Sequence, residues 1–179
     1  MNIFMVDEDP RIAAQAMVDR HVVKMILESG QLLSTAHRLL DGKETMAKSK
    51  TGRNVKRYVL PDEREPILYG ATHINHPSAI WCRTSIENYS WLHHHMMALL
   101  EEYSYRYGKV HKCDSMRGPL FNCPLNIDYE APWQDPPQAM PDDSKVDGDS
   151  VQGYRNYYIN HKVRFAKWTK RTQPDWWKI

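Results

Sequence analysis

Apolar residues recur at three- and four-residue steps in three long stretches of the chain, the spacing of one face of an α-helix. The first stretch covers residues 10–40 and opens with Asp9-Pro10, a capping residue before a proline suited to the first helical position. It could bend near Asp19 or Gly30. The second covers residues 77–107, and the third runs from about residue 150 to 171. The pattern predicts a mainly α-helical protein with three long helices.

The segments between these helices lack a clear period. Residues 1–5, MNIFM, are a short apolar piece that is either an extended edge or a tucked terminus. Residues 42–68 are basic, with scattered glycine and proline, and predict an irregular connection that could order on a partner. Residues 111–150 hold six prolines and predict loops with one helical turn at 114–120. We expect no other strand, and a single compact helical domain over residues 1–179 with extended loops and an aromatic C-terminal tail.

Polar residues on the first helix raise the question of function. In DRHVVKMILES and the turns after it, polar side chains fall within an arc of roughly 80° at 100° per residue; they are His21, Lys24, Glu28, Gln31 and Thr35. One interpretation is a solvated helix face with an exposed Lys24–Glu28 pair. The other is a site in which histidine, amine and carboxylate act as proton shuttle, nucleophile and acid or base.

Composition limits the class of protein. The chain has 179 residues, of which 41% are apolar, enough for one domain with a substantial core. Three cysteines, no charged-then-apolar leader and no apolar run near 18 residues predict a soluble protein of a reducing compartment, the cytoplasm, with no membrane association. The histidines and cysteines do not have the paired spacing of zinc ligands, and glycine-rich phosphate loops are absent, so we expect no metal or cofactor.

Positive charge is concentrated near the C-terminus. Residues 151–179 contain seven lysines and arginines against one acid, interleaved with aromatic residues. Such a surface can neutralise phosphates and offer rings for stacking on bases, although the aromatics could instead be core and the lysines solvated. The predicted DNA-binding residues are Arg53, Lys56, Arg57, Arg155, Lys162, Trp176 and Trp177.

Three features together resemble a known family. They are the DRHVVKMILES segment on the first helix, the aromatic second helix and the ending RTQPDWWKI. This arrangement resembles the small helical pyrimidine-dimer DNA glycosylases with AP-lyase activity encoded by tailed phages. That family has Asp-x-His early in its first helix and its catalytic glutamate seven residues after the histidine, which here are Asp19, His21 and Glu28. The chain is also similar to uncharacterised tailed-phage proteins that share HVVKM, NHPSA and PPQAMPD.

The resemblance implies an amine nucleophile working with Glu28 on damaged or modified pyrimidines in double-stranded DNA, in the host cytoplasm if the protein is phage-encoded. The family uses the α-amino group of a threonine exposed by loss of methionine, whereas this chain begins Met1-Asn2. An α-amino group, with a reference pKa near 7.7–8.0, is neutral far more often than an ordinary lysine. We therefore predict Met1 as the nucleophile over Lys24, with His21 assisting, in a monomer without a metal.

Two alternatives come from other classes of protein. A DNA-binding or inhibitory phage protein would keep the basic surface and need no Glu28. A nucleotide-metabolism enzyme would use His21, Lys24 and Glu28 on a free nucleotide.

Overall fold

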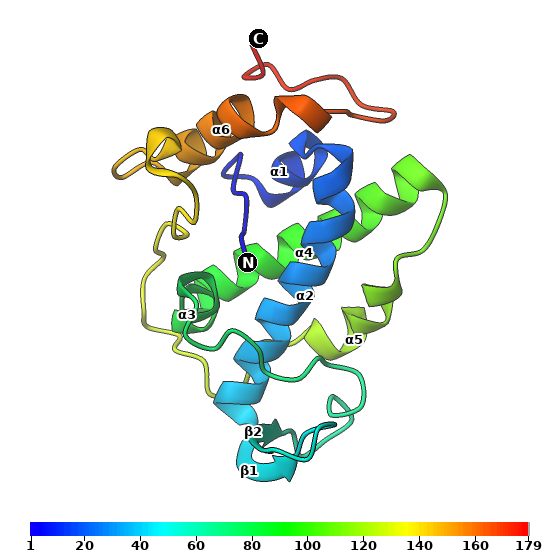
Figure 1. Ribbon diagram of the computed structural model, residues 1–179, viewed down its shortest axis with the longest axis vertical. Coiled ribbons are helices and arrows are strands. Elements are labelled where there is room, and N and C mark those ends of the chain that lie inside the picture. The colour runs from blue at the N-terminus through cyan, green and yellow to red at the C-terminus, as the bar shows by residue number, and fades with distance from the viewer. Residues whose placement is uncertain (179) are drawn as a thin grey trace.

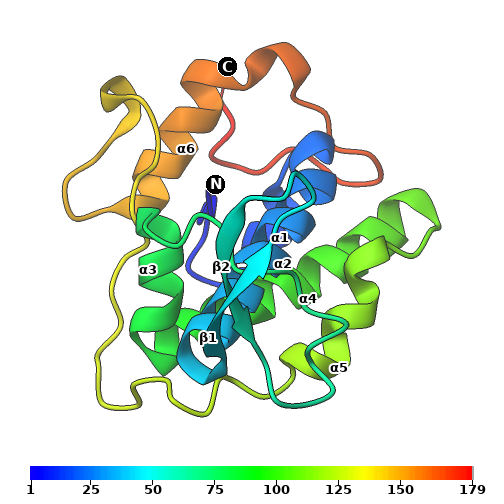
Figure 2. The same cartoon turned by 60° about the horizontal axis from the view of Figure 1, so that its bottom comes forward.

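The computed structural model describes residues 1–178, in which six α-helices surround a common core. Their bounds are α1 Pro10–Ala16, α2 Asp19–Asp41, α3 Pro77–Thr84, α4 Ile86–Tyr107, α5 Arg117–Leu120 and α6 Ser150–His161. Helices α2 and α4 cross at the centre, α6 and the C-terminal tail lie over α1 at one end, and a small sheet lies at the other (Figure 1). The amino terminus lies near the middle of the molecule, between α2, α3 and α6 (Figures 1 and 2).

The mainly helical prediction is correct, but each of the three long helices is interrupted. The first breaks at Met17-Val18, whose backbone is extended, so that α1 and α2 are separate helices. The buried Arg106 compensates for this break, because its guanidinium donates to the carbonyl oxygens of Gln15 and Met17, both at 2.9 Å. The 3.6-residue pattern continues across the break because both helices bury apolar side chains in the same core.

The second predicted helix is divided in two, and the third ends early. Residues 77–107 divide at Ser85, which is extended and whose hydroxyl caps α4 by accepting from the backbone N–H of Asn88 at 3.2 Å. The third helix ends at His161, and a 3₁₀ turn at Val163–Phe165 leads into an irregular tail. Within 111–150, the predicted helical turn is confirmed as a 3₁₀ turn at Lys112–Met116 followed by α5, and a second 3₁₀ turn covers Asp142–Ser144.

The prediction of an irregular connection over residues 42–68 was wrong. Strands β1 Lys43–Lys48 and β2 Asn54–Val59 pair antiparallel, with Lys43 opposite Val59 and Lys48 opposite Asn54. Gly52, at φ +79°, closes the turn by donating its N–H to the Ser49 carbonyl at 2.9 Å. Alternation of apolar and polar residues was weak because every residue of the two strands is exposed or half-buried.

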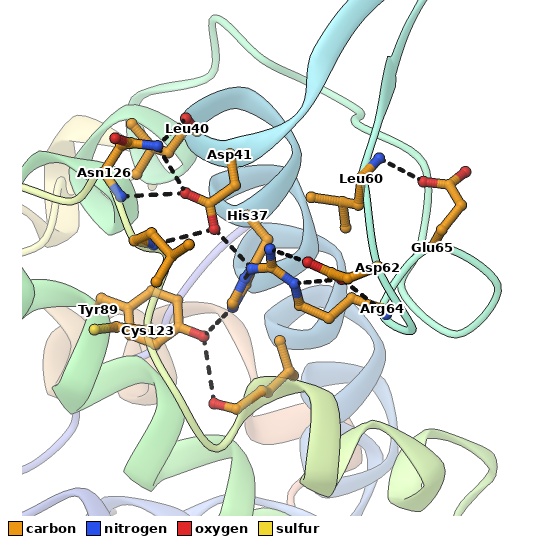
Figure 3. A network of polar contacts seen from close by, with 12 residues as sticks. His37, Leu40, Asp41, Leu60, Asp62, Arg64, Glu65, Tyr89, Cys123 and Asn126 are labelled. Atoms are coloured by element: carbon orange, nitrogen blue, oxygen red, sulfur yellow. Dashed lines mark hydrogen bonds and ion pairs between the residues drawn. The ribbon is translucent and has the colours of Figure 1, made fainter.

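A buried polar network fixes the end of α2 from which the hairpin departs (Figure 3). The Arg64 guanidinium pairs with Asp41 at 2.6 Å and Asp62 at 2.7 Å, and donates to Nδ1 of His37 at 2.8 Å. Burial, and then the Arg64 charge, lower the pKa of His37 to about 4, so the ring is neutral and Nδ1 accepts. Its Nε2 bonds the Tyr89 hydroxyl at 2.7 Å. This network joins the chain after the hairpin to α2 and α4.

Candidate active site at the amino terminus

Helix α2 presents Lys24 and Glu28 on successive turns, and the amino-terminal segment lies beside them. One carboxylate oxygen of Glu28, Oε1, is 3.1 Å from Nζ of Lys24. The other, Oε2, accepts the backbone N–H of Asn2 at 2.9 Å. The Glu28 side chain is 14% exposed, whereas that of Lys24 is 63% exposed. The carboxylate therefore lies between a side-chain amine and the first peptide nitrogen, which is 26 residues away in sequence.

Asn2 is held by several other segments of the chain. Its Nδ2 donates to the carbonyl oxygen of Ala139 at 2.8 Å, and its Oδ1 accepts from the Tyr154 hydroxyl at 2.6 Å and the Ile3 N–H at 2.9 Å. Burial raises the pKa of Tyr154 well above its usual range, so the hydroxyl stays protonated and can donate. The terminus is thus tucked and fixed opposite Glu28.

The buried Phe4, two residues after Asn2, has a strained backbone. Its φ is +55°, in the left-handed region that bulky L-residues rarely adopt. Its ring lies 4.3 Å, centroid to centroid, from that of His21. Such strain persists only where the surroundings enforce it, and it concentrates at functional sites. Its presence next to the amino terminus agrees with a site there.

His76 is the imidazole that borders this site. It caps α3, since its Nδ1 accepts from the Ser78 N–H at 3.1 Å. Burial, then the α-ammonium group of Met1 and the neighbouring His73, lower the pKa of His76, while the Glu28 carboxylate raises it. The ring therefore lies within the electrostatic reach of both Met1 and Glu28.

Met1 is half-buried, and among the ion pairs of residues 1–178 its α-amino group has none with Glu28. Its nitrogen is one residue from the Asn2 nitrogen, which limits it to about 7 Å from Oε2 by backbone dimensions.

His21 does not converge on this site. It is two turns from Glu28, about 10 Å along the helix, and its Nδ1 lies 2.6 Å from the Tyr158 hydroxyl. Burial, then the charges of Lys162 and Lys24, lower its pKa to about 3. The ring is 6% exposed and neutral, and it packs α2 against α6. His21, Lys24 and Glu28 therefore do not surround one reacting atom.

Asp19, the other residue of the Asp-x-His pair, holds the C-terminal tail. Its carboxylate accepts from the Thr169 N–H at 2.9 Å and hydroxyl at 2.7 Å, and pairs with Arg106 at 2.9 Å. Burial opposes ionisation, but these bonds outweigh it and lower the pKa of Asp19. The two motif residues thus dock the tail and α6 onto the start of α2.

The predicted DNA-binding residues fall into two groups. Arg53, Lys56 and Arg57 are exposed on the hairpin, where Lys56 pairs with Glu44 at 2.9 Å. The others lie on α6 and the tail and are partly engaged. Arg155 donates to the Val6 carbonyl at 2.8 Å and pairs with Asp7 at 3.2 Å, and Nζ of Lys162 lies 4.0 Å from the Tyr157 ring centroid.

The two tail tryptophans are half-buried and pack edge-to-face on the body. Trp176 contacts Tyr158 with ring centroids 5.8 Å apart, and Trp177 contacts Trp168 at 5.0 Å. Their first role is to hold the tail down, and each keeps part of its surface exposed.

Comparisons with protein-family models, with the curated proteins and with the solved structures gave no match. Within residues 1–178, no three histidine, cysteine or acidic side chains gather as a metal-ligand set. No helix in the described part of the chain is long and apolar enough to cross a membrane.

Proposed function

We propose that this protein is a DNA glycosylase with AP-lyase activity, acting on damaged or modified pyrimidines in double-stranded DNA. One observation carries the proposal: Glu28 Oε2 lies 2.9 Å from the Asn2 nitrogen, so a carboxylate and the chain's amino end meet at one place. A primary amine and an adjacent carboxylate are the minimum set of groups required to form an imine at C1′ of a sugar. The resemblance of the Asp19-x-His21 segment and its glutamate to the phage glycosylases points the same way.

The α-amino group of Met1 is the better nucleophile of the two amines. Lys24 is held in an ion pair with Glu28 at 3.1 Å, and an ammonium group has no free electron pair with which to attack. The Met1 amine has no such partner among residues 1–178 and has an intrinsically weaker affinity for protons than a lysine. If Met1 were removed, the nitrogen already beside Glu28, that of Asn2, would become the terminal amine.

The reaction proceeds in balanced steps. The neutral amine attacks C1′, the N-glycosidic bond breaks, and the base leaves with the bonding electrons and gains a proton. The sugar ring opens to an imine between C1′ and the protein. Glu28 stabilises the cationic imine and takes a proton from C2′, and the C3′–O bond breaks as the 3′ phosphate leaves. Water then hydrolyses the imine, which restores the amine.

The chemistry requires access to C1′ in a duplex, and therefore bending of the DNA or extrusion of a base. The strained Phe4 and the bonds to Asn2 hold the amino end before the DNA arrives, so little ordering is needed on binding. His21 and Lys24 contribute indirectly: His21 fixes α6, and Lys24 holds the Glu28 carboxylate in place through their ion pair.

Borohydride trapping on an oligonucleotide duplex with one abasic site tests the proposal. Reduction of the imine should give a covalent protein–DNA adduct whose peptide map places the DNA on the first residue. Intact mass before the reaction identifies whether that residue is Met1 or Asn2. An N-terminal extension of several residues should abolish the adduct, because it moves the amine away from Glu28.

Glu28→Gln separates chemistry from folding. Glutamine retains an oxygen that can accept the Asn2 N–H, so the fold should be kept while lyase turnover falls at least 100-fold. Glu87→Gln, an exposed position in the first turn of α4, is the matched control and should act like the parent protein. A protein that binds duplex DNA but gives neither adduct nor base release on a panel of pyrimidine lesions would be the non-catalytic DNA binder, and would overturn the proposal.

A further inference from the structure

The β1–β2 hairpin is the most cationic exposed element of the fold. Between Lys43 and Val59 it has six cationic side chains against the single acid Glu44, a net charge of +5 on a protein whose total is +2. Its cations, all exposed, are Lys43, Lys48, Lys50, Arg53, Lys56 and Arg57. Every one of its residues is exposed or half-buried. The hairpin does not contribute to the buried apolar core, so packing in that core does not explain its residues.

The two faces of this ribbon differ. Thr45, Ala47 and Val55 are half-buried and share one face, which turns toward the body, where Arg57 comes close to Gly70. The opposite face is formed by three cross-strand pairs, Glu44 with Tyr58, Met46 with Lys56, and Lys48 with Asn54. On this outer face Met46 is 62% exposed.

The outer face matches the chemistry and the size of a DNA groove. Lysine and asparagine are residues that donate to base edges, and an apolar side chain can contact the thymine methyl group. Two strands of six residues make a ribbon about 20 Å long. The major groove of B-form DNA, about 12 Å wide, admits a two-stranded ribbon.

The hairpin also points to the side of the molecule that carries the amino terminus. In Figure 1 it is seen nearly end-on, below the terminus, and in Figure 2 its turn reaches up to the level of the terminus. A duplex that meets the amino end can therefore meet the hairpin as well.

We propose that the β1–β2 hairpin is a groove-binding arm that inserts the outer face formed by Met46, Lys48, Asn54 and Lys56 into the major groove of duplex DNA. Arg53, beside the turn, contacts a flanking phosphate. The Lys56–Glu44 pair, 62% and 50% exposed, is a weak surface pair that exchanges readily for phosphate or base contacts. This inference rests on the proposed function only in taking duplex DNA as the partner.

The test measures binding of an undamaged 30-base-pair duplex by fluorescence anisotropy across a salt series. Lys48→Ala/Lys56→Ala should weaken binding about tenfold or more near 0.1 M salt and reduce the slope of log K against log salt by about 2, one for each lost cation. Lys109→Ala/Lys112→Ala removes two exposed lysines from the connection after α4 and is the matched control. Its salt slope should stay that of the parent. Unfolding midpoints in urea confirm that all three proteins are equally folded.

Dimethyl sulfate footprinting identifies the groove, because the reagent methylates guanine N7 in the major groove and adenine N3 in the minor groove. The parent protein should protect N7 positions over a few base pairs, and Lys48→Ala/Lys56→Ala should lose this protection. Duplex RNA, whose deep and narrow major groove excludes a ribbon, should bind the parent and the double variant equally.

Equal DNA affinity and salt slope in the two double variants, or protection of adenine N3 alone, would overturn the inference. Its failure is distinct from failure of the proposed function. If the hairpin variants bind DNA like the parent but borohydride still traps an adduct, the hairpin inference fails and the glycosylase proposal is retained. If N7 protection depends on the hairpin but no adduct forms, the hairpin inference is retained and the protein is a non-catalytic DNA binder.

Discussion

The buried His95 should make the protein's stability strongly dependent on pH. Its side chain is fully buried in α4 against Trp91, at 4.9 Å between ring centroids, and neither ring nitrogen has a hydrogen-bond partner among the described residues. Burial lowers its pKa to about 3, from 6.5 for an exposed histidine. The unfolded chain therefore binds a proton at mildly acidic pH that the folded chain cannot accept. Stability is full above pH 6.5 and is lost as the pH falls from 6.5 toward 3.

The magnitude follows from the two pKa values. Between pH 7 and pH 5, linkage gives a loss of about 2 kcal/mol from this one group, since each pKa unit corresponds to about 1.4 kcal/mol. No discount for solvent screening applies, because the ring is 0% exposed. His21, with a pKa of about 3 in the fold, adds a similar term of its own.

Urea unfolding at pH 7 and pH 5 measures this term by difference. His95→Leu removes the titrating ring and its two unpaired nitrogens, so the stability lost between the two pH values should be about 2 kcal/mol smaller than in the parent. His94→Leu, at the exposed neighbouring position, should keep the full parental loss. If leucine overpacks the site, His95→Met is the more adaptable replacement. An unchanged pH dependence in a folded His95 variant would refute the reasoning.

Two further changes test the polar contacts of the fold. Arg64→Met leaves the Asp41 carboxylate, 3% exposed, with only the N–H donors of Leu125 and Asn126, and should lower the free energy of unfolding by about 3 kcal/mol. Arg117→Met breaks a partly exposed pair and should cost under about 1 kcal/mol; equal costs in urea unfolding would contradict the network. Asn2→Ala removes the bonds that fix the amino terminus and should lower stability by about 1–2 kcal/mol and reduce the yield of borohydride adduct more than tenfold; an unchanged yield in a folded variant would show that Asn2 does not position the amine.

Local sequence patterns predicted those elements whose signals lie within a few residues. Asp9 and His76 both cap helices, and each precedes a proline, because a side-chain acceptor and a fixed φ act over a single turn. Helical spacing alone places His93, Met96 and Leu100 on one face of the helix at 86–107. Met96 and Leu100 are buried, whereas His93 is only half-buried and His95, two residues further on, is fully buried. A central helix is covered on more than one side, and its own spacing does not reveal this.

The missed features depend on residues far apart in the chain. The break at Met17 is stabilised by Arg106, 89 residues away, which no local window contains. The hairpin was not predicted because its faces are too exposed to alternate clearly between apolar and polar residues.

The same division applies to the candidate site. The sequence by itself determined the helical class, the caps and the line of polar residues that includes Lys24 and Glu28, because these follow from helix periodicity and from side chains that bond within one turn. Only the tertiary structure decided which of those residues share a site. It buried His21 beneath α6, brought Asn2 and His76 near Glu28, and held Asn2 with Ala139 and Tyr154, because long-range packing and hydrogen bonds place segments that helix spacing cannot relate.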